Sequence, residues 1–247
     1  MSGQDETSTF GPHQGFLTTR WSLIASAGDR ASPKSAEALA TLCQIYWYPV
    51  YAYIRRRGLG VHEAEDLTQG FFAKLLEKGY LSHVDQSRGK FRSFLLTAVK
   101  HYLANEWQRK NAQKRGGGVT LISLDFQDAE GRYRLEPSGG LTPEQIFERR
   151  WAMTVLETAL GRTRQWYVGR NRLERFERLK ACLDGTSPKT YRELGDELHM
   201  TEAAVRQEVA RMRSRYRQEL HGQIAETLAD PLDTKEEMRR LAAAVAL

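Results

Sequence analysis

The chain of 247 residues carries a formal net charge of +6, and its pI is about 9.3. This basic balance favours a polyanionic partner, and the length allows a buried core in one or two domains. Cys43 and Cys182 lie far apart, which excludes a disulfide framework and a paired-cysteine zinc site, and no metal or cofactor is expected. The amino terminus is polar and no apolar run reaches about 18 residues, so we expect a cytoplasmic protein without a membrane span.

Helical signals begin after a polar amino terminus. Residues 1–15 are rich in Ser, Thr, Gly and Gln, and we predict that they are disordered. A first helical domain is predicted for residues 16–115. Within it, Ser32 begins a helix that reaches Pro49, and we expect a separate segment from there to Gly58.

The helix predicted for residues 62–79 has an acidic amino-terminal half. Its apolar stripe comprises Ala64, Leu67, Phe71, Leu75 and Leu76. The acidic and polar residues are Glu63, Glu65, Asp66 and Gln69. Acids in a first turn stabilise the helix dipole by about 0.3 to 1 kcal/mol each, which is one explanation for them. A surface that meets a basic partner is the other.

The most basic segment runs from Phe91 to Arg115 and has six Lys or Arg residues against one acid, Glu106. Apolar residues at spacings of three and four predict an amphipathic helix. Lys100 and Trp107 lie seven residues apart, hence on one face off the apolar stripe. Cations bind phosphates and an exposed aromatic ring stacks on unpaired bases. A solvated helix with Trp107 packed on a neighbour is the alternative, and a break near Asn105 would turn this ring into the core.

A change in composition separates this segment from a second helical domain. Residues 116–141 are rich in Gly, Asp and Ser, and we predict a linker with a small hairpin or a docked segment. Its one strand-like run covers residues 119–126. Thr142 and Gln145 match a capping box, so a helix begins there and opens a domain over residues 142–229.

The second domain contains two helices joined by a short turn. Thr190 and Glu193 form a capping box, a turn follows at Met200, and an Arg-rich helix begins at Glu202. Gly195 permits close approach of a neighbouring helix. The residues expected to face inward on the second helix are Val205, Val209, Met212 and Tyr216. This is the helix-turn-helix pattern, and a helical hairpin with an Arg-rich outer face is the alternative.

Residues 230–247 form a predicted C-terminal helical extension with a capping box from Thr234 to Glu237. Isolated helices below about 12 to 15 residues are marginal in water, so we expect this helix to dock. We hypothesise that it packs on the second domain and modulates DNA binding.

Three segments in this order resemble the extracytoplasmic-function sigma factors of bacterial RNA polymerase. They read EDLTQGFF, RGKFRSFLLTAVKHYLANEWQRK and TYRELGDELHMTEAAVRQEVARMR. The resemblance covers about residues 16–115 and 142–225. It implies an all-α fold of two small helical domains joined by a linker, with a helix-turn-helix in the second. It also implies a sigma factor that binds RNA polymerase core and directs promoter recognition, DNA melting and transcription initiation.

The resemblance also implies partners and contact residues. The partners are the β′ clamp and β flap of the polymerase core, and promoter DNA. Contacts with the clamp would come from Glu65, Asp66, Leu67, Gln69 and Phe72. The minus-10 element would be held by Arg88, Lys90, Lys100, Asn105, Trp107 and Arg109. The minus-35 element would be read by Arg192, Glu202, Arg206, Gln207, Arg211 and Arg213.

Within the minus-35 set, Arg192 and Arg213 are expected on phosphates, and the others on base edges. Glu208 stands where the family commonly has a cation, which weakens the inference of a base contact at that position. An anti-sigma factor and a Ser/Thr kinase are further candidate partners.

Other functions remain open at this point. A two-domain helix-turn-helix regulator that works without polymerase is the alternative within transcription. An enzyme is not expected, because the acids near Glu63 have no second His, Cys or Asp cluster to complete a site.

Thr68 is a candidate phosphorylation site among the clamp-facing acids. A phosphate would add about −1.5 to −2 charges there and raise affinity for a basic clamp. An ordinary residue of the helix surface is the alternative.

Overall fold

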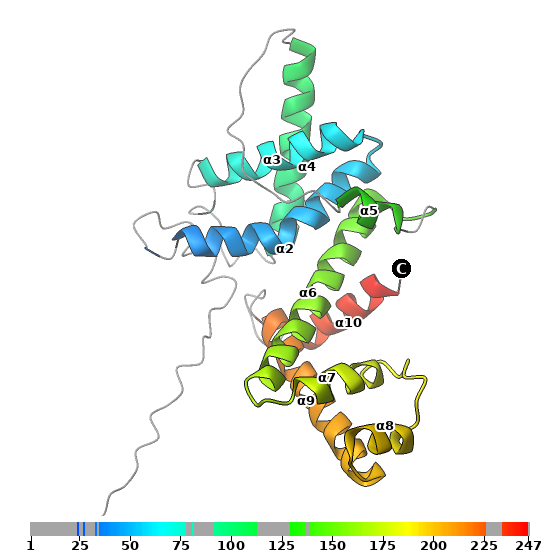
Figure 1. The fold of residues 1–247 in the computed structure, drawn as a ribbon. Helices are drawn as coiled ribbons and strands as arrows, with labels where there is room; N and C mark the ends of the chain where they lie inside the picture. The colour runs from blue at the N-terminus through cyan, green and yellow to red at the C-terminus, as the bar shows by residue number, and fades with distance from the viewer. Residues whose placement is uncertain are drawn as a thin grey trace, which may run out of the picture.

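The computed structural model describes residues 24, 27, 33, 35–77, 81, 91–112, 129–136, 139–225 and 234–246. Every regular element in these ranges is a helix, which confirms the predicted all-α class (Figure 1). The expected disordered amino terminus and the strand-like run of residues 119–126 lie outside the described residues.

The first three helices of Figure 1 are α2 (Ser35–Arg56), α3 (Val61–Glu77) and α4 (Phe91–Ala112). The break expected after Pro49 is wrong, because α2 continues through this residue. A proline costs a helix one backbone hydrogen bond. Burial of Tyr48 and Val50 on either side of it holds the helix together. Gly58 does end the segment, in a left-handed conformation with φ of 88°.

Helix α6 (Pro143–Val168) begins where the sequence predicts. The hydroxyl of Thr142 accepts a hydrogen bond from the Gln145 backbone N–H at 3.2 Å. The Gln145 side chain accepts one from the Thr142 N–H at 2.8 Å. This reciprocal pair confirms the capping box and satisfies two donors that the helix end would otherwise leave open.

Helix α6 belongs to two hydrophobic cores. Phe147 and Val155 lie in the first core together with residues of α2, α3 and α4, whereas Tyr167 lies in the second. The first core also includes Leu220 at the end of α9 (Glu202–Ala225) and Leu241 of α10 (Thr234–Val245). The predicted domain boundary at residue 142 stays a prediction, but residues on both sides of it share one core.

The second core is built by the end of α6, α7 (Leu173–Leu179), α8 (Tyr191–Leu198) and α9. A short 3-10 turn (Lys180–Cys182) follows α7. The residues expected inward on α9 are buried, except for a half-buried Tyr216. The capping box at the start of α8 is confirmed by the hydrogen bonds between Thr190 and Glu193.

Gly195 lies against the turn that joins α8 to α9. A Cβ atom at this position would lie 2.6 Å from the backbone oxygen of Met200, a distance that real Cβ atoms do not show. His199 completes the turn in a left-handed conformation, with φ of 52°. The predicted close approach is confirmed, but its nearest neighbour is the connecting turn and not the helix that the sequence led us to expect.

Two segments outside the predicted domains, α5 (Ala129–Arg134) and α10, pack on the helices described above. Within the predicted linker, α5 packs beside α2, and Glu130 accepts a hydrogen bond from the Tyr51 hydroxyl at 3.0 Å. Helix α10 packs on α6 and α9, so the C-terminal extension docks as its short length predicts (Figure 1).

Candidate polymerase and nucleic-acid interfaces

The five residues predicted to meet the clamp lie on different sides of α3. Asp66 is exposed, Glu65 and Gln69 are half-buried, and Leu67 is half-buried in the wall of a groove beside α4. Phe72 is buried in the first core, where its ring meets Phe71 edge-on. In this conformation Phe72 cannot contact a partner, so that prediction is wrong.

The prediction of a phosphorylation site at Thr68 is also contradicted. Its side chain is fully buried, and its hydroxyl donates a hydrogen bond to the Ala64 carbonyl at 2.6 Å. Helix α3 lies across both α2 and α4, so its buried arc is wider than the stripe of a helix with one neighbour (Figure 1). A kinase cannot reach this hydroxyl in the folded chain.

Helix α4 continues without a break past Asn105, which decides the orientation of Trp107. The indole of Trp107 is 72% exposed, so it lies outside the core. Lys100 and Trp107 line the same groove of about 480 Å³, together with Leu103. The predicted shared face of these residues is therefore confirmed.

The groove also contains a cation that the sequence analysis did not select. Arg57 lines it from the connection between α2 and α3, and donates a hydrogen bond to the Tyr53 hydroxyl at 3.3 Å. Two cations, an exposed aromatic ring and the apolar Leu67 thus border one concavity, which the acids Glu63 and Glu106 also line. The run of arginines before Gly58 was the signal in the sequence, but it did not show which of them lies at the groove.

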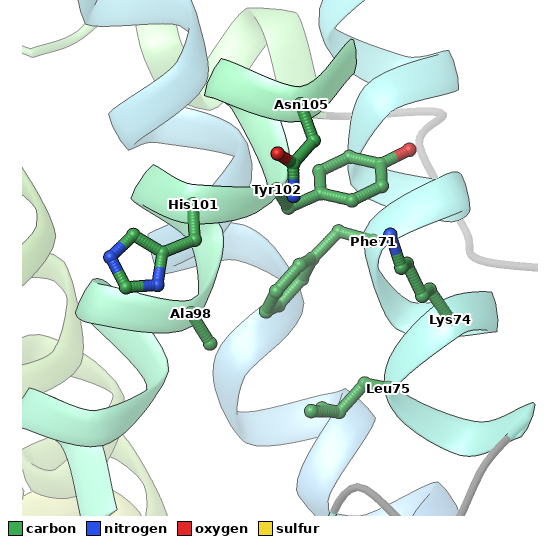
Figure 2. A pocket seen from close by; sticks show the side chains of 7 residues that line it. All are labelled: Phe71, Lys74, Leu75, Ala98, His101, Tyr102 and Asn105. Carbon is green, nitrogen blue, oxygen red and sulfur yellow. The ribbon is translucent and has the colours of Figure 1, made fainter.

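Asn105 lies on the opposite face of α4. Together with Tyr102, and with Phe71 and Lys74 of α3, it lines a small pocket of about 30 Å³ (Figure 2). The rings of Phe71 and Tyr102 pack edge-on in its wall, with their centroids 5.7 Å apart. A space of this size holds about one water molecule, so we do not treat it as a ligand site. Asn105 itself is exposed.

Three residues of the minus-10 set remain, and only Arg109 lies among the described residues. Arg109 is exposed and pairs with Glu106 at 3.1 Å on its own helix. Arg88 and Lys90 lie outside the described residues. These three therefore stay predictions.

Lys100 is paired with an acid from the other helical unit. Its Nζ lies 2.8 Å from Oε1 of Glu144, and both side chains are 43% exposed. The hydrogen bond with Glu144 raises the pKa of Lys100, and the same bond lowers the pKa of Glu144. The charge of Arg57 lowers the pKa of Glu144 further, so this carboxylate lies in the field of both groove cations.

On α9, most of the residues predicted to read the minus-35 element are exposed. Glu202 and Arg206 form an exposed ion pair at 2.9 Å. The exposed residues of this set on α9 are Glu202, Arg206, Gln207 and Arg211, and Arg217 further along the helix is exposed too. Arg192 of α8 is exposed as well.

Arg213 is held by the protein itself. Its Nη2 and Nε donate to the backbone carbonyl of Cys182 at 2.6 and 3.2 Å, and the side chain is half-buried. The predicted phosphate contact is therefore wrong for this conformation. Glu208 is buried beside Tyr167 and pairs with Arg211 at 3.3 Å, so it faces the second core.

The described part of the chain lacks two other kinds of functional feature. No helix there is long and apolar enough to cross a lipid bilayer. Across the same ranges, His, Cys, Asp and Glu side chains form no group of three or more that could hold a metal ion. Cys43 and Cys182 are free and buried.

A comparison with protein families identifies the chain. A family model described as ECF sigma factor matches residues 59–222, which includes α3, α4, α6 and α8, and most of α9. No curated protein and no solved structure gives a significant match. Because the family model matches more than half of the sequence, the chain belongs to the ECF sigma factor family and has the role of a sigma factor in transcription initiation.

Proposed function

We propose that this sigma factor binds RNA polymerase core through the exposed acidic side of α3 and holds two promoter elements. In this proposal α4 melts and holds the minus-10 element, and α9 reads the minus-35 element in the major groove. The first helical domain, predicted for residues 16–115, meets the β′ clamp. The second, predicted for residues 142–229, meets the β flap. An anti-sigma factor stays a candidate partner on the grounds of the family alone.

The observation that carries the proposal is the groove beside α4. Trp107 is 72% exposed, although a tryptophan usually buries most of its ring. It shares the groove with the cations Lys100 and Arg57, and with the acids Glu63 and Glu106. A cation that follows the backbone and an aromatic ring that stacks on bases are the two features of a site for unpaired DNA. Base stacking of this kind contributes about 1 to 3 kcal/mol per base.

The exposed face of α9 supports duplex recognition by the second unit. Arg206, Gln207 and Arg211 are exposed in the first half of the helix. Arginine pairs with the O6 and N7 atoms of guanine, and glutamine pairs with adenine. Each good bidentate pair contributes about 1 to 3 kcal/mol of discrimination against the wrong base.

Asp66 and Glu65 support the contact with polymerase. Glu65 already pairs with His62 at 3.5 Å whenever the imidazole is protonated, so Asp66 is the better candidate for the partner. Complementary charge mainly sets encounter rate and specificity. A regulator that works without polymerase would not need this acidic face or the groove of α4.

Run-off transcription with RNA polymerase core on a promoter library tests the proposal. We expect specific transcripts only when both the chain and core are present. Asp66→Asn should weaken core binding, and Glu174→Gln, which removes a charge from the exposed surface of α7, is the control. A chain that binds duplex promoter DNA but neither co-purifies with core nor supports transcription would overturn the proposal.

A further inference from the structure

Glu144 is the ion-pair partner of Lys100, one of the two cations that line the groove. It belongs to the first turn of α6, and its carboxylate is 2.8 Å from the Lys100 ammonium group. Arg57 contributes to the same electrostatic environment from the groove wall. A carboxylate and a phosphodiester oxygen both accept charge-assisted hydrogen bonds from a lysine. The two groups therefore compete for Lys100.

A second ion-pair cluster holds α6 in this position. Nε of Arg92 on α4 lies 2.9 Å from Oε2 of Glu148 on α6, and Nη1 pairs with Oε1 of Glu237 on α10. The Arg92 guanidinium also lies 4.2 Å from the centre of the Trp151 ring. The Arg92 side chain is 7% exposed and that of Glu237 is 0% exposed, so water does not screen this pair as it screens a surface pair.

Helix α10 adds apolar contacts to the cluster. Leu241 and Ala244 are buried in the first core, on the same helix as Glu237. The helix is too short to be stable alone, so its order depends on this docking. Through Arg92, the C-terminal extension therefore connects the helix proposed to hold DNA with α6.

We propose that the free chain adopts an autoinhibited form, in which Glu144 pairs with Lys100 as a phosphate mimic and α10 holds the first turns of α6 in place through Glu237 and Arg92. The inference rests on the proposed binding of single-stranded DNA at the α4 groove. The inhibitor belongs to the same chain, so its effective concentration at Lys100 is high and does not depend on dilution. DNA gains access to Lys100 when the first turn of α6, which carries Glu144, moves away from α4.

A DNA-binding assay tests whether Glu144 competes with DNA for Lys100. The affinity for a fluorescein-labelled single-stranded DNA of mixed sequence is measured by fluorescence anisotropy at low salt. We expect Glu144→Gln to bind about 2- to 5-fold more tightly than the wild type, as expected for loss of a partly exposed ion pair. Lys100→Met should remove this gain when it is combined with Glu144→Gln. The matched control is Glu174→Gln, which removes the same charge from α7.

The outcomes separate this inference from the proposed function. Equal affinities for the Glu144→Gln and Glu174→Gln variants, together with a loss of affinity on Lys100→Met, would overturn the autoinhibition and leave the DNA site intact. If Lys100→Met does not weaken binding even in the Glu144→Gln background, then the proposed DNA site is wrong as well.

Hydrogen–deuterium exchange tests whether the Glu237–Arg92 pair holds α10 and α6 in place. Glu237→Gln should speed exchange in α10 and in the first turns of α6, and leave α8 unchanged. Glu236→Gln is the control, because Glu236 is half-exposed and pairs with Arg239 and Arg240 of its own helix. Unchanged exchange in α6 would overturn this part of the proposal.

A second measurement covers the case in which Glu237→Gln fails to fold. The wild-type chain in complex with core polymerase and promoter DNA should lose exchange protection at α10 relative to the free chain. Full protection of α10 in that complex would overturn the proposal.

Discussion

The guanidinium group of Arg55 binds both carboxylate oxygens of Glu130, with Nη2 2.9 Å from Oε1 and Nε 3.0 Å from Oε2. The two residues are 75 positions apart in the chain, and the pair is partly buried. Arg55 also lies over the Tyr133 ring, 4.9 Å from its centre. These contacts fix α5, a part of the predicted linker, to α2.

We therefore expect Glu130→Gln to lower the free energy of unfolding by about 1 to 3 kcal/mol, since it weakens a charge-assisted bidentate bond. Urea denaturation of the full chain measures this. Glu174→Gln should change stability by less than about 0.5 kcal/mol. Equal stability of the two variants would mean that α5 is not held by this pair.

The same pair predicts a dependence on pH. The hydrogen bond with Arg55 lowers the pKa of Glu130 below its ordinary value of 4.5. A lowered carboxyl pKa stabilises the folded state above the unfolded pKa, and this stabilisation is lost as the pH falls through the folded pKa. The stability difference between the wild type and Glu130→Gln should hold at neutral pH and shrink below about pH 4.5. A difference that grows on acidification would contradict this assignment.

Trp107→Ala should impair promoter opening without destabilising the chain. The ring is 72% exposed, so the free energy of unfolding should change by less than about 0.5 kcal/mol. Loss of one stacking contact of about 1 to 3 kcal/mol corresponds to about 5- to 150-fold weaker strand binding. Permanganate footprinting of the promoter and thermal melting measure the two effects. A large drop in melting temperature with normal opening would contradict both the exposure and the stacking role.

Gly195→Ala should destabilise the second helical unit. Its new Cβ would collide with the Met200 carbonyl at 2.6 Å, and overpacking of this kind costs about 1 to 3 kcal/mol. Gly161→Ala on α6 is the matched control, because nothing lies within 4 Å of a Cβ there. That control should stabilise the chain by about 0.5 to 1 kcal/mol. Thermal unfolding of both variants checks the contrast, which would be absent if the turn could shift.

Arg192 and Arg213 should behave differently, although both were expected on phosphates. Arg192→Ala should weaken duplex binding and lower the salt-dependence slope by about 1, because this exposed cation is available to a phosphate. Arg213→Ala should leave the slope unchanged and lower the free energy of unfolding by about 1 to 3 kcal/mol, since the Cys182 carbonyl loses its donor. Equal slopes in the two variants would contradict this division.

Local rules in the sequence were enough to predict most of the helices and their starts. The capping boxes at Thr142 and Thr190 lie where their spacing predicts, because the hydrogen bonds involved span three residues. Pro49 was misjudged because its tolerance within α2 depends on the packing of the surrounding turns. That packing involves residues distant in the sequence.

For the candidate site, the sequence predicted that Lys100 and Trp107 share a face, because this follows from helical spacing alone. It could not predict that Thr68 and Phe72 are buried while Asp66 is exposed. The exposure of a helix face depends on how many neighbours the helix has, and α3 packs on two.

The sequence by itself determined the helical class, the order of the helices and their family resemblance, since each rests on short-range patterns of residues. Only the tertiary structure decided which cationic side chains form ion pairs or hydrogen bonds within the protein. Arg55 pairs with Glu130, whereas Arg57 lines the groove, although the two are neighbours in one arginine run. Likewise Arg213 binds the Cys182 carbonyl and Lys100 faces Glu144. The partner of a long charged side chain is set by distant segments, and no local pattern encodes it.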